Sequence, residues 1–277
     1  MIKKENLMNQ LFTIDNKTAV ISGGAGVLGL EIAGYLLKEG VKVFILDYNE
    51  TLLTKAVSKL EAYGDVHGFL CNVLEEDDLL STKSAIMEQV DQIDILINAA
   101  GGNRKGANIS PDSNIFKMDR QDFKMVNDLN FLGTVYPTLV FGEAMANNGK
   151  GSIINFSSMA TVQSISRVMG YSAAKAAVDN FTKWMAQELA SKFGDQIRVN
   201  AIAPGFFVTH QNRAILINED GSLTKRSELV MQKTPMNRFG KPEELCGAIH
   251  FLCAEASSFI TGTIIPIDGG FSSFSGV

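Results

Sequence analysis

Apolar runs and helix-period segments alternate along the whole chain. The apolar runs, several nearly continuous in Val and Ile, are Thr18–Ser22, Lys42–Leu46, His67–Leu70, Ile93–Asn98, Ser152–Phe156, Arg198–Ile202 and Thr263–Ile267. Between them, apolar positions recur at helical spacing in Leu28–Glu39, Thr51–Tyr63, Glu76–Val90, Arg120–Asn147, Tyr171–Phe193 and Pro242–Ala254. Strict strand–helix alternation is typical of a parallel sheet whose strands are buried on both faces. We therefore expect one α/β domain over residues 1–277, doubly wound, with seven parallel strands and helices on both faces.

Two segments fall outside this alternation and are predicted to be added loops. Gly102–Met118 follows the fourth apolar run, and Phe206–Pro235 follows the sixth. Both begin where a strand ends, at the carboxyl edge of the sheet, which is where open α/β sheets bind ligands. A loop as long as the second one is uncommon unless it has a function. We therefore expect it to cover a substrate.

The composition narrows the class of protein. Hydrophobic residues make up 45% of 277 residues, enough to build a core, which excludes a disordered protein. Lys and Arg number 25 against 30 Asp and Glu, and the net charge of −5 disfavours nucleic acid as a partner. The N-terminus lacks the apolar core of a secretory signal. Residues 19–37 have the length of a membrane span, but their glycines and strand-like start predict a strand, a turn and a helix, and no membrane partner.

The cysteines and histidines predict neither a disulfide framework nor a metal site. Cys71, Cys246 and Cys253 are few and far apart, which favours a reducing, cytoplasmic setting. Cys246 and Cys253 share one face of a predicted helix, where two small buried side chains are a better interpretation than a redox pair. The three histidines have no cysteine or carboxylate at metal-ligand spacing, so we expect no metal.

A glycine-rich turn joins the first strand to the first helix. Without a Cβ, its backbone amides can approach a pyrophosphate at the positive end of that helix. The second strand ends in Asp47, whose carboxylate can bind both ribose hydroxyls of NAD and would repel the 2′-phosphate of NADP. No Arg or Lys lies in the turn or just after Asp47. The sequence therefore favours NAD over NADP as cofactor; the alternative is an Asp that only caps the next helix.

Tyr171 and Lys175 lie four residues apart at the start of a predicted helix, which places them on one face. A tyrosine is a feeble base at its free pKa of about 10. A nearby ammonium favours the phenolate and lowers that pKa toward working pH. Ser158 follows the fifth strand, which directs a hydroxyl toward the same edge of the sheet. The three side chains are predicted to form a catalytic group.

Together these motifs resemble the short-chain dehydrogenase/reductase family. The matching residues stand in the family's order over essentially the whole sequence: Ser22–Gly29, Asn98–Gly101, Asn130, Ser158, Tyr171, Lys175, Pro204–Thr209, Thr261–Gly262 and Asp268–Gly270. The resemblance implies a Rossmann-type fold, hydride transfer with a nicotinamide cofactor, and a homotetramer that pairs helices equivalent to Arg120–Asn147 and Tyr171–Phe193. An apolar stripe on the second helix faces either a partner or the sheet: Ala174, Val178, Phe181, Met185 and Leu189.

The resemblance also assigns roles. Ser158 would hold and polarise the substrate oxygen, and Tyr171 would give or take the proton. Lys175 would lower the pKa of Tyr171 and bind the nicotinamide ribose, while Asn130 would hold a water in the proton path. Val208 and Thr209 would orient the carboxamide. The implied cofactor-binding residues are Gly23, Gly24, Ala25, Gly26, Val27, Leu28, Gly29, Asp47, Asn72, Val73, Asn98, Ala99, Ala100, Gly101, Tyr171, Lys175, Pro204, Gly205, Val208 and Thr209.

Two positions depart from the family's pattern. The usual second glycine of the turn is Val27, with Gly26 one place earlier, which predicts a shifted path for the turn. The usual Asp near the adenine is Asn72, which can still accept and donate hydrogen bonds.

Within the family, the sequence most resembles the D-mannonate oxidoreductases of the short-chain type, also called fructuronate reductases. The resemblance rests on Ser22–Gly29, Ala100–Asn103, Ala203–Phe207, Gln211–Asn212, Leu216–Gly221, Thr234–Met236, Arg238–Pro242 and Ser275–Val277. It implies NAD(H)-dependent interconversion of a keto sugar acid and its hydroxy acid, D-fructuronate and D-mannonate. A sugar acid needs a cation and amides in its site. Predicted substrate residues are Gly102, Asn103, Ser158, Arg167, Phe206, Gln211 and Asn212, and further candidate cations are Arg104, Lys105, Arg213 and Arg226.

Three alternatives stay open at this point. The first is another polyol or ketose oxidoreductase, such as a gluconate 5-dehydrogenase-like enzyme. The second is an apolar steroid or acyl-chain substrate, which Phe206, Phe207, Ile215 and Leu216 would suit. The third is a dinucleotide-binding protein without catalysis, which the complete set of Asn130, Ser158, Tyr171 and Lys175 argues against.

Overall fold

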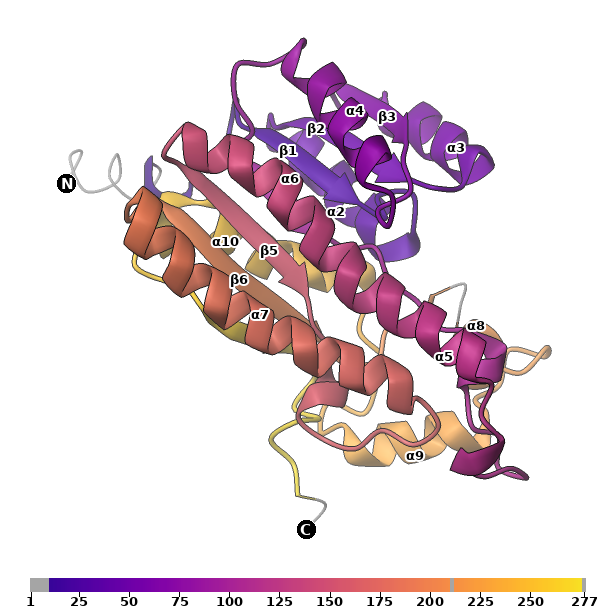
Figure 1. Ribbon diagram of the computed structural model, residues 1–277. Helices are drawn as coiled ribbons and strands as arrows, with labels where there is room; N and C mark the ends of the chain where they lie inside the picture. Colours follow the sequence, from indigo (N-terminus) through magenta and orange to yellow (C-terminus); the bar gives the residue numbers. More distant parts are fainter. Residues whose placement is uncertain (1–9, 210–211, 276–277) are drawn as a thin grey trace, which may run out of the picture.

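A parallel sheet forms the centre of the molecule (Figure 1). The computed structural model describes residues 10–209 and 212–275. Within them the strand order is β3-β2-β1-β4-β5-β6-β7, and every neighbouring pair is parallel. The strand order reverses between β1 and β4, and such a switch point is where open α/β sheets place their ligand crevice. The strands are β1 Thr18–Ser22, β2 Lys42–Asp47, β3 Val66–Leu70, β4 Ile95–Asn98, β5 Gly151–Phe156, β6 Ile197–Pro204 and β7 Ile264–Ile267.

Helices cover both faces of the sheet. On one face α2 (Val27–Lys38), α3 (Glu50–Leu60) and α10 (Cys246–Cys253) pack their apolar sides against the strands. On the other, α4 (Glu76–Met87), α6 (Gly133–Asn147) and α7 (Met169–Phe193) do the same. Figure 1 shows α6 and α7 in front of the sheet and α10 behind it. The predicted fold, a Rossmann-like sheet of seven parallel strands between two helix layers, is confirmed.

The long helix predicted over Arg120–Asn147 is interrupted. It consists of α5 (Arg120–Asn127), a π-helical turn (Asp128–Leu132) and α6. Pro137, inside α6, lacks the N–H that an unbroken helix needs at that position. π-Turns inside α-helices are frequent at functional sites, and this one places Asn130 at its centre, fully buried.

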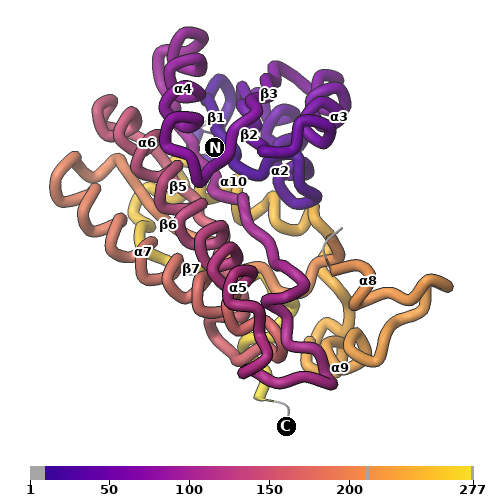
Figure 2. Tube along the Cα trace, turned by 45° about the vertical axis from the view of Figure 1, so that its right-hand side comes forward, coloured from indigo at the N-terminus to yellow at the C-terminus, as the bar shows by residue number. Residues whose placement is uncertain are grey.

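The prediction that Phe206–Pro235 is a loop is wrong, because the segment contains two helices. These are α8 (Arg213–Leu216) and α9 (Lys225–Lys233). α9 is capped by Thr224, whose side chain accepts a hydrogen bond from the Ser227 N–H, and it buries only Ser227 and Val230, so its sequence contains few apolar residues. Gly102–Met118 contains only two short 3₁₀ turns. Figure 2 shows α8 and α9 at the same end of the molecule as α5.

Smaller differences concern the ends of elements and the two helices that carried open questions. Predicted Pro242–Ala254 begins as a 3₁₀ turn, Pro242–Leu245, before α10. Both cysteines of α10 are buried and unpaired, and burial raises the pKa of Cys246 to about 11 and that of Cys253 to about 12, which supports their interpretation as inert core residues. The apolar stripe of α7 faces its own sheet, because Val178, Met185 and Leu189 are buried there. No helix in the described parts of the protein is both long and apolar enough to cross a membrane.

Candidate active site

The glycine turn brings backbone against backbone. Gly23 has a φ of 65°, and a Cβ there would come within 2.8 Å of the Cα of Ala100. A Cβ on Gly29 would come within 2.4 Å of the Gly23 carbonyl oxygen. These glycines therefore allow the turn to pack on itself and on the end of β4. This close packing is a second reason for glycine at these positions, which the sequence did not reveal. Gly26 is the N-cap of α2, with extended backbone and no capping side chain, and Val27 is the first helical residue.

The start of α2 is thereby left as a bare helix N-terminus at the carboxyl edge of the sheet. Its first amides have no side-chain acceptor, and the helix dipole makes this end positive. No acidic side chain lies in the first turn. This is the arrangement in which helix N-termini bind phosphate groups.

Asp47 is held ready at the end of β2. Its side chain is buried, and Oδ1 accepts a hydrogen bond from the Asn49 N–H at 3.0 Å. α3 is capped by Asn49, whose side chain accepts from Leu52. The alternative that Asp47 caps this helix is therefore wrong. Within the described residues Oδ2 has no hydrogen-bond partner, so it can accept from a ligand.

Asn72 and Val73 lie after β3 as predicted for an adenine site. The Asn72 side-chain oxygen accepts from the Leu74 N–H at 3.2 Å, and the backbone N–H of Asn72 donates to Asp78 at 2.9 Å. The side-chain oxygen is thus engaged in the local turn. The amide NH₂ remains to donate, so Asn72 can contribute a donor where the family has a carboxylate.

Asn98, which is among the residues predicted to bind the cofactor, directs its side chain into the protein interior. It is fully buried, and its Nδ2 donates to Thr138 Oγ1 at 2.8 Å and to Asn155 Oδ1 at 2.9 Å. Asn155 in turn donates to Thr182 at 2.9 Å. This series of amides and hydroxyls runs along one face of the sheet, from α6 through β4 and β5 to α7. The amide NH₂ of Asn98 is thus satisfied inside the protein, whereas its buried Oδ1 has no hydrogen-bond partner within the described residues.

Asn130 is fixed by three hydrogen bonds around the end of β4. Its Oδ1 accepts from the Gly102 N–H at 3.1 Å, and its Nδ2 donates to the carbonyls of Gly102 at 2.6 Å and Val126 at 2.8 Å. A Cβ on Gly101 would lie 2.8 Å from Asn130 Oδ1 and 3.5 Å from Lys175 Nζ. Asn130 and Lys175 therefore flank the same glycine, although they come from different helices.

Ser158, Tyr171 and Lys175 lie together at the carboxyl end of β5. Ser158 follows this strand, and its Oγ accepts from the Ala160 N–H at 3.1 Å. The Ser158 hydroxyl also lies near enough to Tyr171 to lower the pKa of that phenol. Lys175 is 3% exposed, donates to the Phe156 carbonyl at 2.7 Å and lies 5.8 Å from the centre of the Tyr171 ring. The structure thus brings together all four residues predicted to be catalytic.

The electrostatics differ from the prediction for Tyr171. Burial raises the pKa of Tyr171, and the hydrogen bond from Ser158 offsets this only in part. Burial also lowers the pKa of Lys175 to about 8, which Asp179 partly counteracts. The Lys175 ammonium is directed at the Phe156 carbonyl, so its effect on the phenol is weaker than the loss of hydration. In this state Tyr171 is a proton donor at neutral pH.

The ends of β6 and β7 meet at Gly205. A Cβ there would lie 2.7 Å from the Cα of Asp268, so glycine is required for the two strand ends to approach. Pro204 ends β6, and the Thr209 N–H donates to Asn212 Oδ1 at 2.7 Å. Val208 and Thr209 are placed just beyond this strand end, as predicted for a cofactor contact.

Several predicted substrate residues are occupied by their own loops. The amide of Asn212 bonds the backbone of Thr209 and Phe207, and that of Asn103 bonds Asn108 and the Arg104 N–H. These two side chains therefore hold loops in shape instead of offering free amides. Phe206 packs edge-on against Phe271 with ring centres 5.3 Å apart. Gln211 lies outside the described residues.

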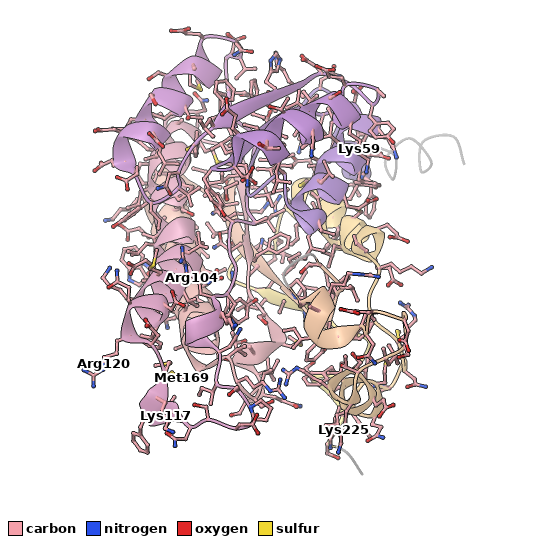
Figure 3. All side chains as sticks on the ribbon, turned by 90° about the vertical axis from the view of Figure 1, so that its right-hand side faces the viewer. Lys59, Arg104, Lys117, Arg120, Met169 and Lys225 are labelled. Atoms are coloured by element: carbon pink, nitrogen blue, oxygen red, sulfur yellow. The ribbon has the colours of Figure 1, made fainter. Side chains whose placement is uncertain are left out.

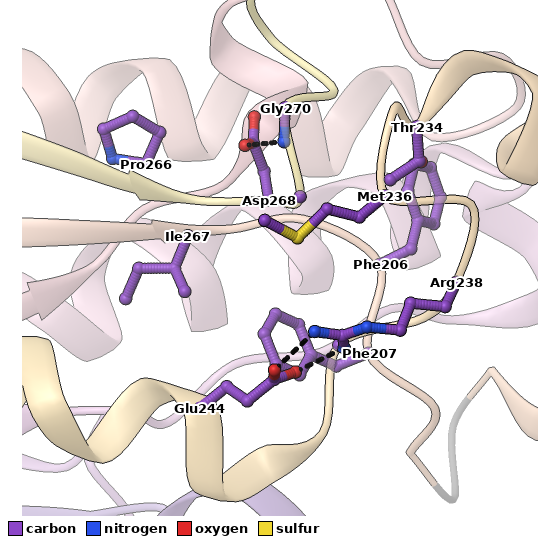
Figure 4. A pocket seen from close by; sticks show the side chains of 12 residues that line it. Phe206, Phe207, Thr234, Met236, Arg238, Glu244, Pro266, Ile267, Asp268 and Gly270 are labelled. Carbon is purple, nitrogen blue, oxygen red and sulfur yellow. Dashed lines mark hydrogen bonds and ion pairs between the residues drawn. The ribbon is translucent and has the colours of Figure 1, made fainter.

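A cavity of about 370 Å³ lies beside the catalytic group, between the ends of β6 and β7 and the segment after α9 (Figure 4). Phe206, Phe207 and Met236 form its apolar wall. Arg238 and Glu244 cross its rim as a two-pronged ion pair of 2.7 and 2.6 Å. Ser158, Tyr171 and Lys175 do not line it. The side chains predicted to be catalytic therefore do not face this cavity.

Sequence reasoning missed the buried polar residues that link α6 and α7 to the strands β4 and β5. Thr138, Asn155 and Thr182 are all buried. An Asn inside the apolar run of β5 was the available signal, since an unpaired amide is costly in a core. Groups of His, Cys, Asp and Glu suited to a metal ion do not occur in the described residues.

Comparison with known proteins identifies the family. A family model described as "Enoyl-(Acyl carrier protein) reductase" matches residues 23–272. The chain belongs to the short-chain dehydrogenase/reductase family, as the sequence motifs predicted, and is an oxidoreductase of the class that acts on alcohol and keto groups.

Particular relatives are more informative. The chain is 42% identical over 274 residues to the uncharacterized oxidoreductase UxuB of Bacillus subtilis (strain 168), with 94% of this chain and 96% of the relative covered. It is similar to a crystal structure, with bound NAD, of a protein from Haemophilus influenzae named as a candidate D-mannonate oxidoreductase. The TM-score is 0.89 at 38% identity, over 96% of this chain and 98% of that one. Gluconate 5-dehydrogenase of Gluconobacter oxydans (strain 621H) is 30% identical over 263 residues, covering 95% and 97%.

Proposed function

We propose that this protein is an NAD(H)-dependent oxidoreductase that interconverts a keto sugar acid and its hydroxy acid, D-fructuronate and D-mannonate. The observation that carries the proposal is the grouping of Ser158, Tyr171 and Lys175 beside Gly101 and Asn130. This group lies at the carboxyl edge of the sheet, where the glycine turn and Asp47 also end. A proton donor next to a dinucleotide site is what carbonyl reduction needs.

The residues present fit NAD. The uncapped start of α2 suits the pyrophosphate, and Asp47 Oδ2 is available for a ribose hydroxyl. A 2′-phosphate at the same place would meet the Asp47 carboxylate with no cation of the turn to offset it. The bound NAD in the Haemophilus relative supports the same choice.

When bound, the cofactor supplies or accepts the hydride. In the reductive direction the Tyr171 hydroxyl gives its proton to the substrate oxygen, and the raised pKa of Tyr171 keeps that proton available. The Ser158 hydroxyl, next to Tyr171, holds the same oxygen. Lys175 stabilises the phenolate that remains on Tyr171. Asn130, hydrogen-bonded to Gly102, holds a water in the path by which a proton returns to Tyr171.

The substrate assignment is supported by the name of the Haemophilus relative and by the motifs shared with D-mannonate oxidoreductases. The similarity to gluconate 5-dehydrogenase favours a second candidate, oxidation of a gluconate-type hydroxy acid. Both substrates are sugar acids that would be oxidised at C5, so the two candidates differ in the configuration at C2, the carbon beside the carboxylate. The apolar alternative is less well supported, because Phe206 packs against Phe271.

A substrate panel tests the proposal. Purified protein is mixed with NADH and D-fructuronate, or with NAD and either D-mannonate or D-gluconate, and absorbance of the reduced cofactor is followed. We expect turnover with the fructuronate–mannonate pair, and its loss by a factor of about 10³ or more in Tyr171→Phe. Tyr63→Phe, a tyrosine on the surface at the end of α3, is the matched control. Cofactor binding without turnover on any sugar acid would contradict the proposal, and turnover of gluconate alone would select the second candidate.

A homotetramer built on the helix layer of α6 and α7 is part of the same proposal. Leu139 on α6 and Trp184 on α7 are 54% and 56% exposed, and both helices lie on the same face of the sheet. A second copy would cover these side chains. Light scattering of the wild type and of Trp184→Glu tests this, with a smaller assembly expected for the variant.

A further inference from the structure

Two arginines from distant parts of the sequence lie close together near the catalytic helix. Arg167 precedes α7, and Arg226 lies in the first turn of α9. The Arg226 guanidinium donates to the Ser166 hydroxyl at 3.0 Å and to the Ser166 carbonyl at 3.4 Å. Burial and the positive charge of Arg167 both lower the pKa of Arg226. The two guanidinium groups therefore repel each other across the contact between α9 and the segment before α7.

Neither of these arginines has a carboxylate partner within the described residues. Other arginines on the same end of the molecule do: Arg104 pairs with Asp122 at 3.7 Å, and Arg238 pairs with Glu244. The position of Arg226 is also unfavourable in itself, because a cation in the first turn of a helix opposes the helix dipole. Folding alone gives no reason for two unpaired, partly buried guanidiniums at this place.

The backbone holds Arg167 in an unusual conformation. Its φ is 79°, the left-handed region that non-glycine residues seldom adopt. Its carbonyl accepts from the Ile109 N–H at 3.0 Å, which ties it to the segment Gly102–Met118. Strain of this kind persists where the surrounding structure enforces it. The segment after β4, the segment before α7 and α9 thus meet at this arginine.

The pair lies within reach of the catalytic tyrosine. Arg167 is four residues before Tyr171, so their Cα atoms are at most about 14 Å apart even if the backbone between them is fully extended. An arginine side chain and a six-carbon acid together span such a distance. Figure 3 shows Lys117, Met169 and Lys225, neighbours of these segments, at the same end of the molecule.

We propose that Arg167 and Arg226 together bind the carboxylate of the substrate, an inference that rests on the proposed function. A carboxylate between them replaces their repulsion with two charge-assisted contacts, which can each be bidentate. The N-terminus of α9 adds favourable dipole charge. Because one arginine lies on α9 and the other beside α7, the acid joins the added helix to the catalytic helix. The pair thereby selects hydroxy acids over neutral polyols.

The test compares an acid with its neutral counterpart. Wild type, Arg167→Gln, Arg226→Gln and the double variant are assayed with NADH and either D-fructuronate or D-fructose. We expect kcat/KM for the acid to fall by about 10- to 100-fold in each single variant, mainly through KM, because the carboxylate is remote from the reacting carbon. Activity on the neutral ketose should be unchanged or higher. Lys225→Gln, which removes an exposed charge from the same turn, is the matched control.

The outcomes separate the two ideas. If the wild type reduces the acid and both arginine variants match Lys225→Gln, the carboxylate pair is refuted and the proposed function stands. If the wild type turns over no sugar acid, the proposed function fails and the pair fails with it. Thermal unfolding and NADH binding of each variant show whether it still folds. If Arg226→Gln does not fold, Arg226→Lys is assayed instead. This variant keeps the positive charge but cannot form a bidentate pair, so its KM for the acid should lie between those of the wild type and Arg167→Gln.

Discussion

Asp47 offers the sharpest test of cofactor choice. Its buried carboxylate uses Oδ1 to accept from Asn49 at 3.0 Å, so the orientation is fixed and Oδ2 remains for a ribose hydroxyl. A hydrogen bond to a charged group contributes about 1.5–3 kcal/mol. Asp47→Ala should therefore weaken NADH binding by about 10- to 100-fold. The same change should strengthen NADPH binding, because two unit charges about 4 Å apart near a protein surface repel by about 4 kcal/mol.

Binding can be measured without any assumption about the substrate. The fluorescence of the reduced nicotinamide gives Kd for NADH and NADPH at several salt concentrations. We expect the wild type to prefer NADH by about 100-fold or more, and Asp47→Ala to lose most of that preference. Glu50→Gln, which removes an exposed carboxylate three residues away, should leave the ratio nearly unchanged. Equal binding of the two cofactors by the wild type, or an unchanged ratio in Asp47→Ala, would falsify this account of Asp47.

Three further changes test other parts of the structure. Thr182→Val keeps the shape but leaves a buried amide donor unpaired, so urea unfolding should show a loss of about 1–3 kcal/mol, whereas Thr54→Val, an exposed helical threonine, should show almost none. Gly29→Ala should abolish NADH binding, because its Cβ would lie 2.4 Å from a carbonyl oxygen; binding within a few-fold of wild type contradicts this. In the folded protein the pKa of Lys175 is about 8, below its ordinary value of 10.5. Between pH 8 and 10.5 the unfolded protein therefore binds more protons than the folded one, and the free energy of unfolding rises with pH. Lys175→Met should lack this gain of about 3 kcal/mol, and parallel pH profiles of the two proteins would refute it.

The strands, and the grouping of the residues proposed to be catalytic, were predictable because their signals are local. Val- and Ile-rich runs such as β1 and β5 are apolar on both faces, and a parallel sheet covered by helices on both sides buries both of those faces. Tyr171 and Lys175 share a helix face whatever surrounds them. α9 gave no such signal, since its residues are mostly exposed and its start depends on one capping threonine.

The destinations of polar side chains were not predictable. The sequence did not indicate that Thr138 and Asn155, 40 and 57 residues away from Asn98, accept hydrogen bonds from its amide. Asn212 and Asn103 were expected to bind a substrate, but each forms hydrogen bonds with backbone groups of its own loop. A side-chain amide takes the nearest partner that the fold supplies, and sequence spacing does not contain that distance.

The sequence by itself determined the order of strands and helices along the chain, the glycine turn, the carboxylate after β2 and the four residues that we propose to be catalytic. These depend on periodicity and on spacing within one element. Only the tertiary structure decided that burial keeps Tyr171 protonated, that Lys175 donates to a strand carbonyl, and that Arg167 and Arg226 meet. Hydration and long-range charge depend on what covers a group, and that is set by contacts between segments far apart in the sequence.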